Sequence, residues 1–167
     1  MPAPAPPPAL HVVLVAPEIP PNTGAIGRLC VATGSRLHLV KPLGFRIDDR
    51  TLTRAGLDYW DHLDWRLWDS FDSLRTEAIA EATAVGSPDP RFFFFTTKGR
   101  RPYWDQSFKP GDHLVFGRET RGLPESLLAA HPDLCLTIPM HPAARSLNLA
   151  TATAITLYEA CRQIRSI

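Results

Sequence analysis

Residues 114–124 read Leu114-Val115-Phe116-Gly117-Arg118-Glu119-Thr120-Arg121-Gly122-Leu123-Pro124, which takes the chain from an apolar run through a glycine into a charged loop. Short apolar runs of this kind are typical of strands that are buried on both faces of a parallel sheet. The glycine permits close backbone approach or a positive φ, and ligands of α/β sheets bind beyond the carboxyl ends of the strands. The stretch therefore predicts either a ligand-binding loop or a solvated turn between a strand and a helix.

Two other segments follow apolar runs in the same way and favour the ligand-binding interpretation. They cover residues 17–28 and 138–148, and their candidate site residues are Asn22, Arg28, Ser146 and Asn148. Taken singly, each has a plainer interpretation, either as a surface arginine or as a polar residue that caps a helix. Glu119 between two arginines is likewise compatible with an exposed salt bridge. The recurrence of the pattern at three strand ends is what indicates a site.

Strands and helices alternate along the rest of the chain. The expected strands cover residues 11–16, 37–40, 65–68, 91–97, 113–116 and 134–138. The expected helices run from Asn22 or Thr23, as the N-cap, to Gly34, over residues 70–84, and from about Ser146 to about Arg165. This alternation predicts a single α/β domain over residues 11–167, with a parallel sheet flanked by helices. The Pro/Ala-rich residues 1–10 are expected to form a poorly ordered tail.

The composition narrows the functional class without identifying it. The 167 residues are 44% hydrophobic and 21% charged, with a net charge of +1, so any nucleic-acid surface has to be a local basic patch. Three widely spaced cysteines inside apolar segments indicate reduced thiols and a cytoplasmic location. The sequence has no Cys-x-x-Cys and no helical histidine pair, so no metal is expected. No apolar run reaches the ~20 residues of a membrane span, and hydrolase and nucleotide-loop motifs are absent.

Several motifs resemble those of a known enzyme family. They are Glu18-Ile19-Pro20-Pro21-Asn22-Thr23-Gly24, Arg28-Leu29-Cys30, Phe116-Gly117-x-Glu119-Thr120-Arg121-Gly122-Leu123-Pro124, and Ile138-Pro139-Met140 with Arg145-Ser146-x-Asn148-Leu149. Together they resemble the three signature motifs of SPOUT-class RNA 2′-O-ribose methyltransferases, in particular the TrmL-type tRNA (cytidine/uridine-34)-2′-O-methyltransferases. The resemblance extends from Val12 to Gln163, in order and at family spacing. It includes residues 54–59 and 96–99, which are similar to segments of that subfamily.

The resemblance implies a parallel α/β sheet whose C-terminal part is tied in a deep trefoil knot, the SPOUT α/β-knot. It also implies S-adenosylmethionine as the methyl donor and a homodimer that forms through the knot region and the last helix. By match of motif, the residues expected to bind the cofactor are Phe95, Thr96, Gly117, Ile138, Ser146 and Leu147. Tyr158 matches a tyrosine of the subfamily. Two roles are compatible with it, packing at the dimer interface and packing in the core of one subunit.

The implied reaction is a displacement at the methyl carbon by a ribose 2′-oxygen, which needs a base or a polarising group. The residues that match the functional set of the family are Asn22, Arg28, Glu119, Ser146 and Asn148. A guanidinium holds its proton too firmly to be an ordinary base. Arg28 is therefore expected to orient the nucleotide through its phosphate and to stabilise the developing alkoxide. Glu119 is expected to position Arg28 or a partner amide, with Asn22 ordering the motif.

The expected substrate is the anticodon loop of tRNA, with the wobble nucleotide at position 34 as the target. Six basic residues are candidate contacts for the RNA phosphates, although each could equally be a solvated surface charge. They are Arg46, Arg50, Arg54, Lys98, Arg100 and Arg101. Arg118 departs from the family pattern, in which proline is common. Two alternatives stay open: another RNA target such as rRNA, and a catalytically silent dimer that binds RNA or cofactor.

Overall fold

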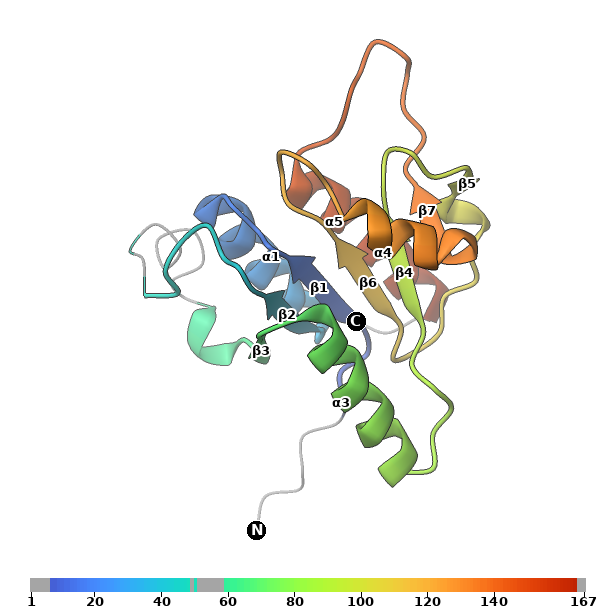
Figure 1. Cartoon of the computed structure of the whole chain (residues 1–167). Helices are drawn as coiled ribbons and strands as arrows, with labels where there is room; N and C mark the ends of the chain where they lie inside the picture. The colour runs from blue at the N-terminus through green and yellow to red at the C-terminus, as the bar shows by residue number, and fades with distance from the viewer. Residues whose placement is uncertain (1–6, 49, 51–58, 165–167) are drawn as a thin grey trace.

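The computed structural model describes residues 7–48, 50 and 59–164 of the chain. In this part, seven strands form one sheet in the order β3-β2-β1-β6-β4-β7-β5, and every pairing between them is parallel. The strands are β1 (His11–Val15), β2 (Arg36–Val40), β3 (Trp65–Trp68), β4 (Phe92–Phe95), β5 (Arg101–Pro102), β6 (His113–Phe116) and β7 (Cys135–Thr137). The predicted parallel sheet is confirmed, and the loops after β4, β6 and β7 gather at one edge of it (Figure 1).

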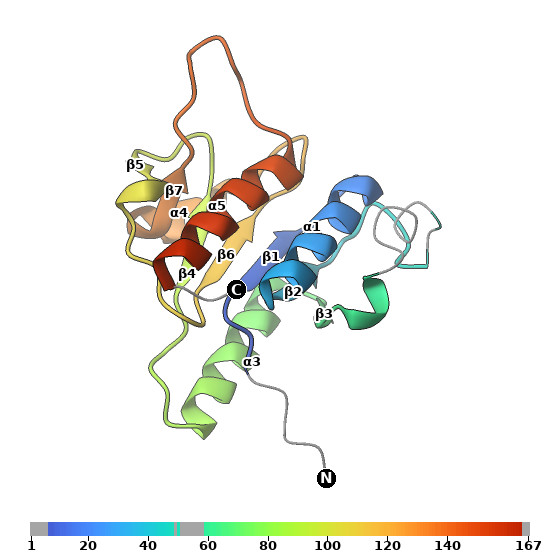
Figure 2. The same ribbon diagram turned by 180° about the vertical axis from the view of Figure 1, so that it is seen from behind.

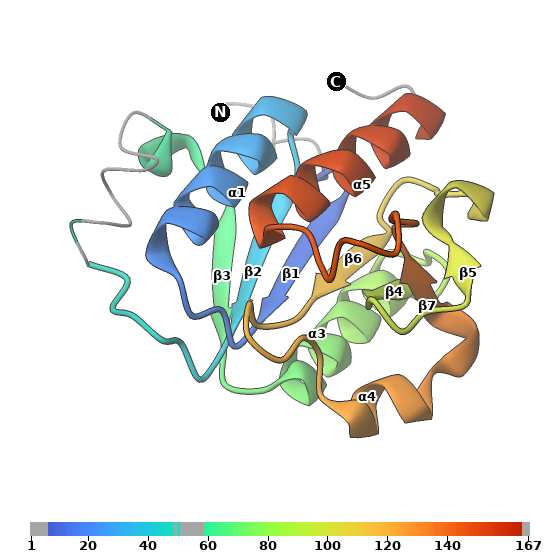
Figure 3. The same cartoon turned by 90° about the horizontal axis from the view of Figure 1, so that it is seen from above.

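Helices cover both faces of this sheet. The described α-helices are α1 (Pro20–Thr33), α3 (Phe71–Ala84), α4 (Glu125–Ala130) and α5 (Leu149–Ile164), and the short 3-10 turns are η1 (Trp60–His62), η2 (Tyr103–Asp105) and η3 (Pro132–Leu134). Figure 3 shows α1 and α5 on one face of the sheet and α3 and α4 on the other. In Figure 2, α1 and α5 run side by side, and they contact each other. None of the described helices combines the length and the apolar character that crossing a membrane requires.

Six of the strands, all but β5, contribute to two hydrophobic cores, one under each helical layer. Successive strand residues point to opposite faces of a sheet. Leu14 of β1 therefore packs with Ile26 of α1 and Leu157 of α5, whereas its neighbour Val13 packs with Leu74 of α3. The four phenylalanines of β4 divide between the two cores in the same way. Burying each such side chain stabilises the fold by ~1.5–3 kcal/mol, which is why the strand residues in these two cores are apolar.

Helix α1 begins earlier than its capping pattern predicted. Its N-cap is Ile19, and two prolines occupy the first helical positions, where a missing N–H costs nothing. Asn22 and Thr23 are buried within the first turn, so the prediction that one of them is the N-cap was wrong. The helix ends at Gly34 as predicted, with a left-handed φ of 64°.

Other boundaries differ by a few residues from the predicted ones. The strand pattern missed β5, which has two residues and pairs with β7. In the segment predicted as a tail, residues 1–6 lie outside the described residues, but Leu10 is fully buried. The backbone carbonyl of Ala9 accepts a hydrogen bond from the N–H of Gly111 at 2.8 Å. The packed part of the chain therefore starts before His11.

Three histidines from neighbouring strands lie together on the face covered by α3. The indole N–H of Trp68 donates to His38 Nδ1 at 3.0 Å, and His38 Nε2 is 2.9 Å from His11 Nδ1. An indole only donates, so a neutral His38 carries its proton on Nε2 and donates it to His11. His113 stacks on His11 with ring centroids 4.1 Å apart. Three imidazoles this close can hold a metal ion, but both nitrogens of His38 are already engaged; the absence of a metal stays a prediction.

These rings are held neutral inside the fold. Burial lowers the pKa of His11 to about 4 and the pKa values of His38 and His113 to about 2, and the positive charges of Arg36 and Arg66 act in the same direction on His11 and His38. The unfolded chain takes up protons at these rings below their ordinary pKa of about 6.5, whereas the folded chain does so only at lower pH. Their contribution to stability is therefore complete above about pH 6.5 and is lost as the pH falls.

We expect the free energy of unfolding to fall between about pH 6.5 and pH 4.5, by up to about 1.4 kcal/mol per pH unit for each neutral ring. The variant His113→Phe tests this, because it removes one titratable ring without breaking a side-chain hydrogen bond. His113 Nδ1 has no hydrogen-bond partner, and the bonds among His11, His38 and Trp68 do not involve His113. Urea unfolding at several pH values should show that the variant takes up about one proton fewer on unfolding, so that its free energy of unfolding falls less steeply with pH. An unchanged slope would contradict the neutral state of His113.

Candidate functional site

A cavity of about 440 Å³ lies at the carboxyl ends of β4, β6 and β7. Its walls include the loops that follow these three strands, which lie at the top of Figure 1. This volume suits a small organic ligand, since such sites usually measure ~300–1,000 Å³. The residues that were predicted to bind the cofactor all line it: Phe95, Thr96, Gly117, Ile138, Ser146 and Leu147.

The cavity combines an apolar wall with polar groups. Phe95 of β4 and Phe116 of β6 stack with ring centroids 4.8 Å apart and an angle of 10° between their planes. Both are buried, as is Leu123, and all three line the cavity. Thr96 and Asn22 add polar side chains to the same space. A flat apolar surface beside polar groups fits a ligand with an aromatic ring and a polar chain, such as a nucleoside.

Gly117 lets the loop after β6 fold back on itself. The N–H of Gly122 donates to the carbonyl of Arg118 at 2.8 Å, which closes a tight loop over Gly117. A Cβ on Gly117 would overlap the backbone of Gly122 and Leu123. Gly122 has a φ of 69°. Of the two roles predicted for the first glycine, close backbone approach belongs to Gly117, and the positive φ belongs to Gly122.

Glu119 secures the start of α1 from the neighbouring loop. Its carboxylate accepts hydrogen bonds from the N–H of Glu18 at 2.8 Å, from the N–H of Ile19 at 3.0 Å and from the side-chain amide of Asn22 at 3.3 Å. Ile19 has no acceptor of its own with which to cap the helix, and negative charge is favourable at a helix N-terminus. In return, the carboxylate of Glu18 accepts from the hydroxyl of Thr120 at 2.9 Å. The two loops are therefore fastened from both sides.

Asn22 and Asn148 extend these hydrogen bonds to the third loop. The amide of Asn148 donates to Asn22 Oδ1 at 3.0 Å. Asn148 Oδ1 accepts from the backbone N–H of Ala150 at 2.9 Å and of Thr151 at 3.3 Å, so it caps α5. One chain of hydrogen bonds thus runs from Glu119 through Asn22 to Asn148 and joins all three strand-end segments.

Arg28 and Ser146 take no part in this chain of bonds. Arg28 is exposed on α1 and is not among the residues that line the cavity. Its guanidinium carbon lies 4.7 Å from the centroid of the Tyr59 ring, and its Nη2 donates to the Tyr59 hydroxyl at 3.2 Å. Of the two partners that were expected for Glu119, the structure shows an amide and not Arg28. Ser146 is exposed on the loop after β7, at the wall of the cavity.

The cations that were predicted to contact phosphate lie on the surface. Those in the described part of the chain are all exposed: Arg46, Arg50, Lys98, Arg100 and Arg101. Arg54 lies outside the described residues, as does most of the segment from 54 to 59 that resembles the subfamily. Arg46 pairs with Asp48 at 3.1 Å and Lys98 pairs with Glu125 at 3.0 Å. Exposed ion pairs of this kind contribute only ~0–1 kcal/mol, so either cation could leave its carboxylate to bind a phosphate.

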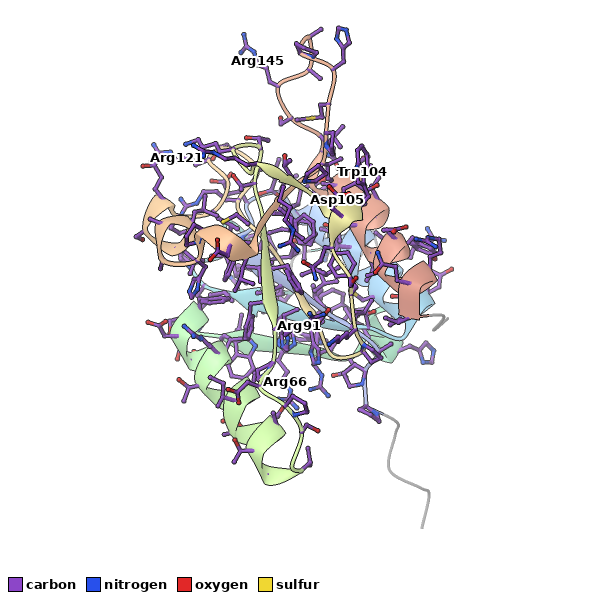
Figure 4. The ribbon with its side chains drawn as sticks, turned by 90° about the vertical axis from the view of Figure 1, so that its right-hand side faces the viewer. Arg66, Arg91, Trp104, Asp105, Arg121 and Arg145 are labelled. Atoms are coloured by element: carbon purple, nitrogen blue, oxygen red, sulfur yellow. The ribbon has the colours of Figure 1, made fainter. Side chains whose placement is uncertain are left out.

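Two further cations line the cavity, although they were not predicted as site residues. They are Arg118 and Arg121 in the loop after β6. Figure 4 shows Arg121 pointing outward at the rim and Arg145 near the tip of the loop after β7. The sequence feature that could have identified these arginines as site residues is their position within the motif segments. The loop after β6 thus brings positive charge to the cavity, and the loop after β7 carries a further cation near its tip.

Known proteins with similar sequences and folds act on RNA. The model of the SpoU rRNA Methylase family matches residues 9–158. The tRNA (cytidine(34)-2′-O)-methyltransferase of Burkholderia ambifaria is 48% identical over 158 residues, which make up 92% of this chain and 94% of the relative. A solved structure described as giving insights into the 2-OH methylation of C/U34 on tRNA is 47% identical, with a TM-score of 0.83 over 92% of this chain and 95% of its own. The SpoU methyltransferase AviRb from Streptomyces viridochromogenes, solved in complex with AdoMet, is 27% identical, with a TM-score of 0.80 over 92% of this chain and 57% of its own.

Proposed function

Because this chain belongs to the SpoU rRNA methylase family and so has the SPOUT α/β-knot fold, we propose that it methylates the ribose 2′-oxygen of nucleotide 34 in tRNA. The observation that carries the proposal is the convergence of three motif segments on one cavity, joined by the hydrogen bonds of Glu119, Asn22 and Asn148. The close relatives carry the same activity in their names. The protein is proposed to act in the cytoplasm.

The residues around the cavity fit S-adenosylmethionine, which supplies an electrophilic methyl group when bound. The stacked rings of Phe95 and Phe116 offer an apolar surface for an adenine. Gly117 lets the loop after β6 fold back on itself, and the residues of this loop, with their backbone polar groups, form part of the cavity wall. Ser146 and Leu147 close the cavity from the loop after β7.

In the proposed reaction, the ribose 2′-oxygen forms a bond to the methyl carbon while the bond from that carbon to the donor sulfur breaks. S-adenosylhomocysteine would be the leaving group, and the proton of the 2′-hydroxyl would pass to solvent water. Arg28 orients the nucleotide through a phosphate and stabilises the oxygen as negative charge develops on it. Glu119 already accepts hydrogen bonds from Glu18, Ile19 and Asn22. Its proposed role is therefore to hold the loops in place and not to take the proton.

The position of Arg28 supports a homodimer. In the described part of the chain, Arg28 is exposed and lies away from the lining of its own cavity. Apolar side chains near the cavity and on α5 are also exposed, with exposed fractions of 44% for Ile19, 36% for Leu147 and 41% for Tyr158. Covering such surface on association is favourable. We therefore propose that two copies pair through the knot region and α5.

The test is methyl transfer from labelled S-adenosylmethionine to tRNA that lacks the wobble 2′-O-methyl group. We expect incorporation of about one methyl group per accepting tRNA, mapped to nucleotide 34, since a single 2′-hydroxyl is the nucleophile. The matched control is the same tRNA with a 2′-deoxynucleotide at position 34, which should accept none. Transfer to rRNA but not to tRNA would show that rRNA is the substrate instead of tRNA. Transfer to neither would contradict the proposed methyltransferase activity.

A further inference from the structure

We propose that Tyr59 is a positioning residue for Arg28, holding the guanidinium in the orientation in which it meets the RNA. The inference rests on the proposed methylation of tRNA and adds to it a residue that lies outside the cavity. Tyr59 directly precedes η1, whereas Arg28 belongs to α1, and the two side chains are joined by two separate contacts.

Tyr59 restrains Arg28 without neutralising it. The ring lies under the guanidinium, and the phenolic oxygen accepts one hydrogen bond from Nη2. A guanidinium has five N–H donors in a planar fork, so the remaining donors stay available for a phosphate. In the described ranges, no carboxylate pairs with Arg28. The side chain therefore keeps its full charge while its conformational freedom is reduced before RNA binds.

Packing against α1 fixes the position of Tyr59 in turn. Trp60 and Leu63, which follow Tyr59, pack over Gly27, the residue before Arg28. A Cβ on Gly27 would lie 3.1 Å from Leu63 Cδ2 and 3.6 Å from the Trp60 ring. The contact that seats η1 on α1 therefore also sets the distance between Tyr59 and Arg28. Positioning of this kind matters because a misplacement of about 1 Å can lower a rate about 100-fold.

A double-mutant cycle on the full chain tests this inference, with tRNA methylation measured under single-turnover conditions. Tyr59→Ala is expected to lower the rate about 2- to 30-fold, the range that a cation–π contact supplies. Tyr59→Phe keeps the ring and should lose less. In an Arg28→Ala background, Tyr59→Ala should cause no further loss, because Tyr59 acts through Arg28.

Two further measurements separate positioning from a general structural role. The affinity for S-adenosylmethionine and the melting temperature should stay at their wild-type values in Tyr59→Phe. Tyr103→Phe is the matched control, since it removes a hydroxyl from another half-buried tyrosine, and it should leave the rate unchanged.

Equal losses from Tyr59→Ala in the wild-type and Arg28→Ala backgrounds would overturn the inference, and so would a wild-type rate in Tyr59→Ala. If Tyr59→Ala does not fold, the same cycle with Tyr59→Phe decides between coupled and independent losses. If the wild-type protein is active but the losses from the Tyr59 and Arg28 substitutions are independent of each other, only this inference is overturned. A wild-type protein that methylates no tRNA overturns the proposed function and this inference with it.

Discussion

Replacing Gly117 by alanine is expected to weaken the binding of S-adenosylmethionine about 10- to 100-fold, since overpacking costs ~1–3 kcal/mol or more and each ~1.4 kcal/mol is a factor of ten. The added methyl group would overlap the backbone of Gly122 and Leu123. Backbone cannot rotate out of the way as a side chain can, so the loop after β6 has to open. Because this loop forms a wall of the cavity, the loss should appear in cofactor affinity, which calorimetry measures directly.

Gly86→Ala is the matched control for this substitution. Gly86 has a φ of 67°, and no atom lies within 4 Å of the place that a Cβ on it would occupy. It follows α3, away from the cavity. A left-handed conformation costs an alanine ~1–2 kcal/mol, so this variant should be less stable while its affinity for the cofactor stays unchanged. Wild-type affinity in Gly117→Ala would contradict the assignment of the loop after β6 to the cofactor.

The apolar runs were a good guide to the sheet for a physical reason. A strand buried on both faces of a parallel sheet has to be apolar throughout, and this leaves a short, bounded signal in the sequence. The strand predicted over residues 113–116 matches β6, and the helix predicted over residues 70–84 matches α3 with Ser70 as its N-cap. The short β5 has no such run, because it lies at the edge of the sheet.

What failed were features that depend on distant residues. The N-cap of α1 was misplaced because the acceptor that serves this helix start is Glu119, which is 100 residues from Ile19 in the sequence. The cluster of His11, His38 and His113 arises from the register of three strands, which no local pattern reveals. Motif spacing could predict which segments meet at the cavity. It could not predict that Arg28 is held by Tyr59, and the catalytic roles stay predictions.

Glu119→Gln is expected to lower the kcat/KM of tRNA methylation about 10- to 100-fold, because hydrogen bonds to a charged group are worth ~1.5–3 kcal/mol each. Glutamine has nearly the same shape but only one acceptor oxygen. The N–H of Glu18 binds one oxygen of the carboxylate, and Ile19 and Asn22 bind the other. One set of these donors would therefore face the NH₂ group of the glutamine. The loops after β1 and β6 would then be held together less firmly, which would loosen the alignment of Asn22 with Asn148.

Glu18→Gln tests whether Glu119 is special or whether any carboxylate in these loops would produce the same loss. Glu18 bridges the same two loops in the opposite direction, but its bonds to Thr120 are exposed, so its loss should cost only about 0.5–1.5 kcal/mol, a few-fold in rate. Steady-state kinetics at saturating cofactor, together with calorimetric titration of S-adenosylmethionine, compares the two variants. Near wild-type turnover and normal cofactor binding in Glu119→Ala would rule out the proposed role, because the bonds from Glu119 would then be dispensable for aligning the three segments.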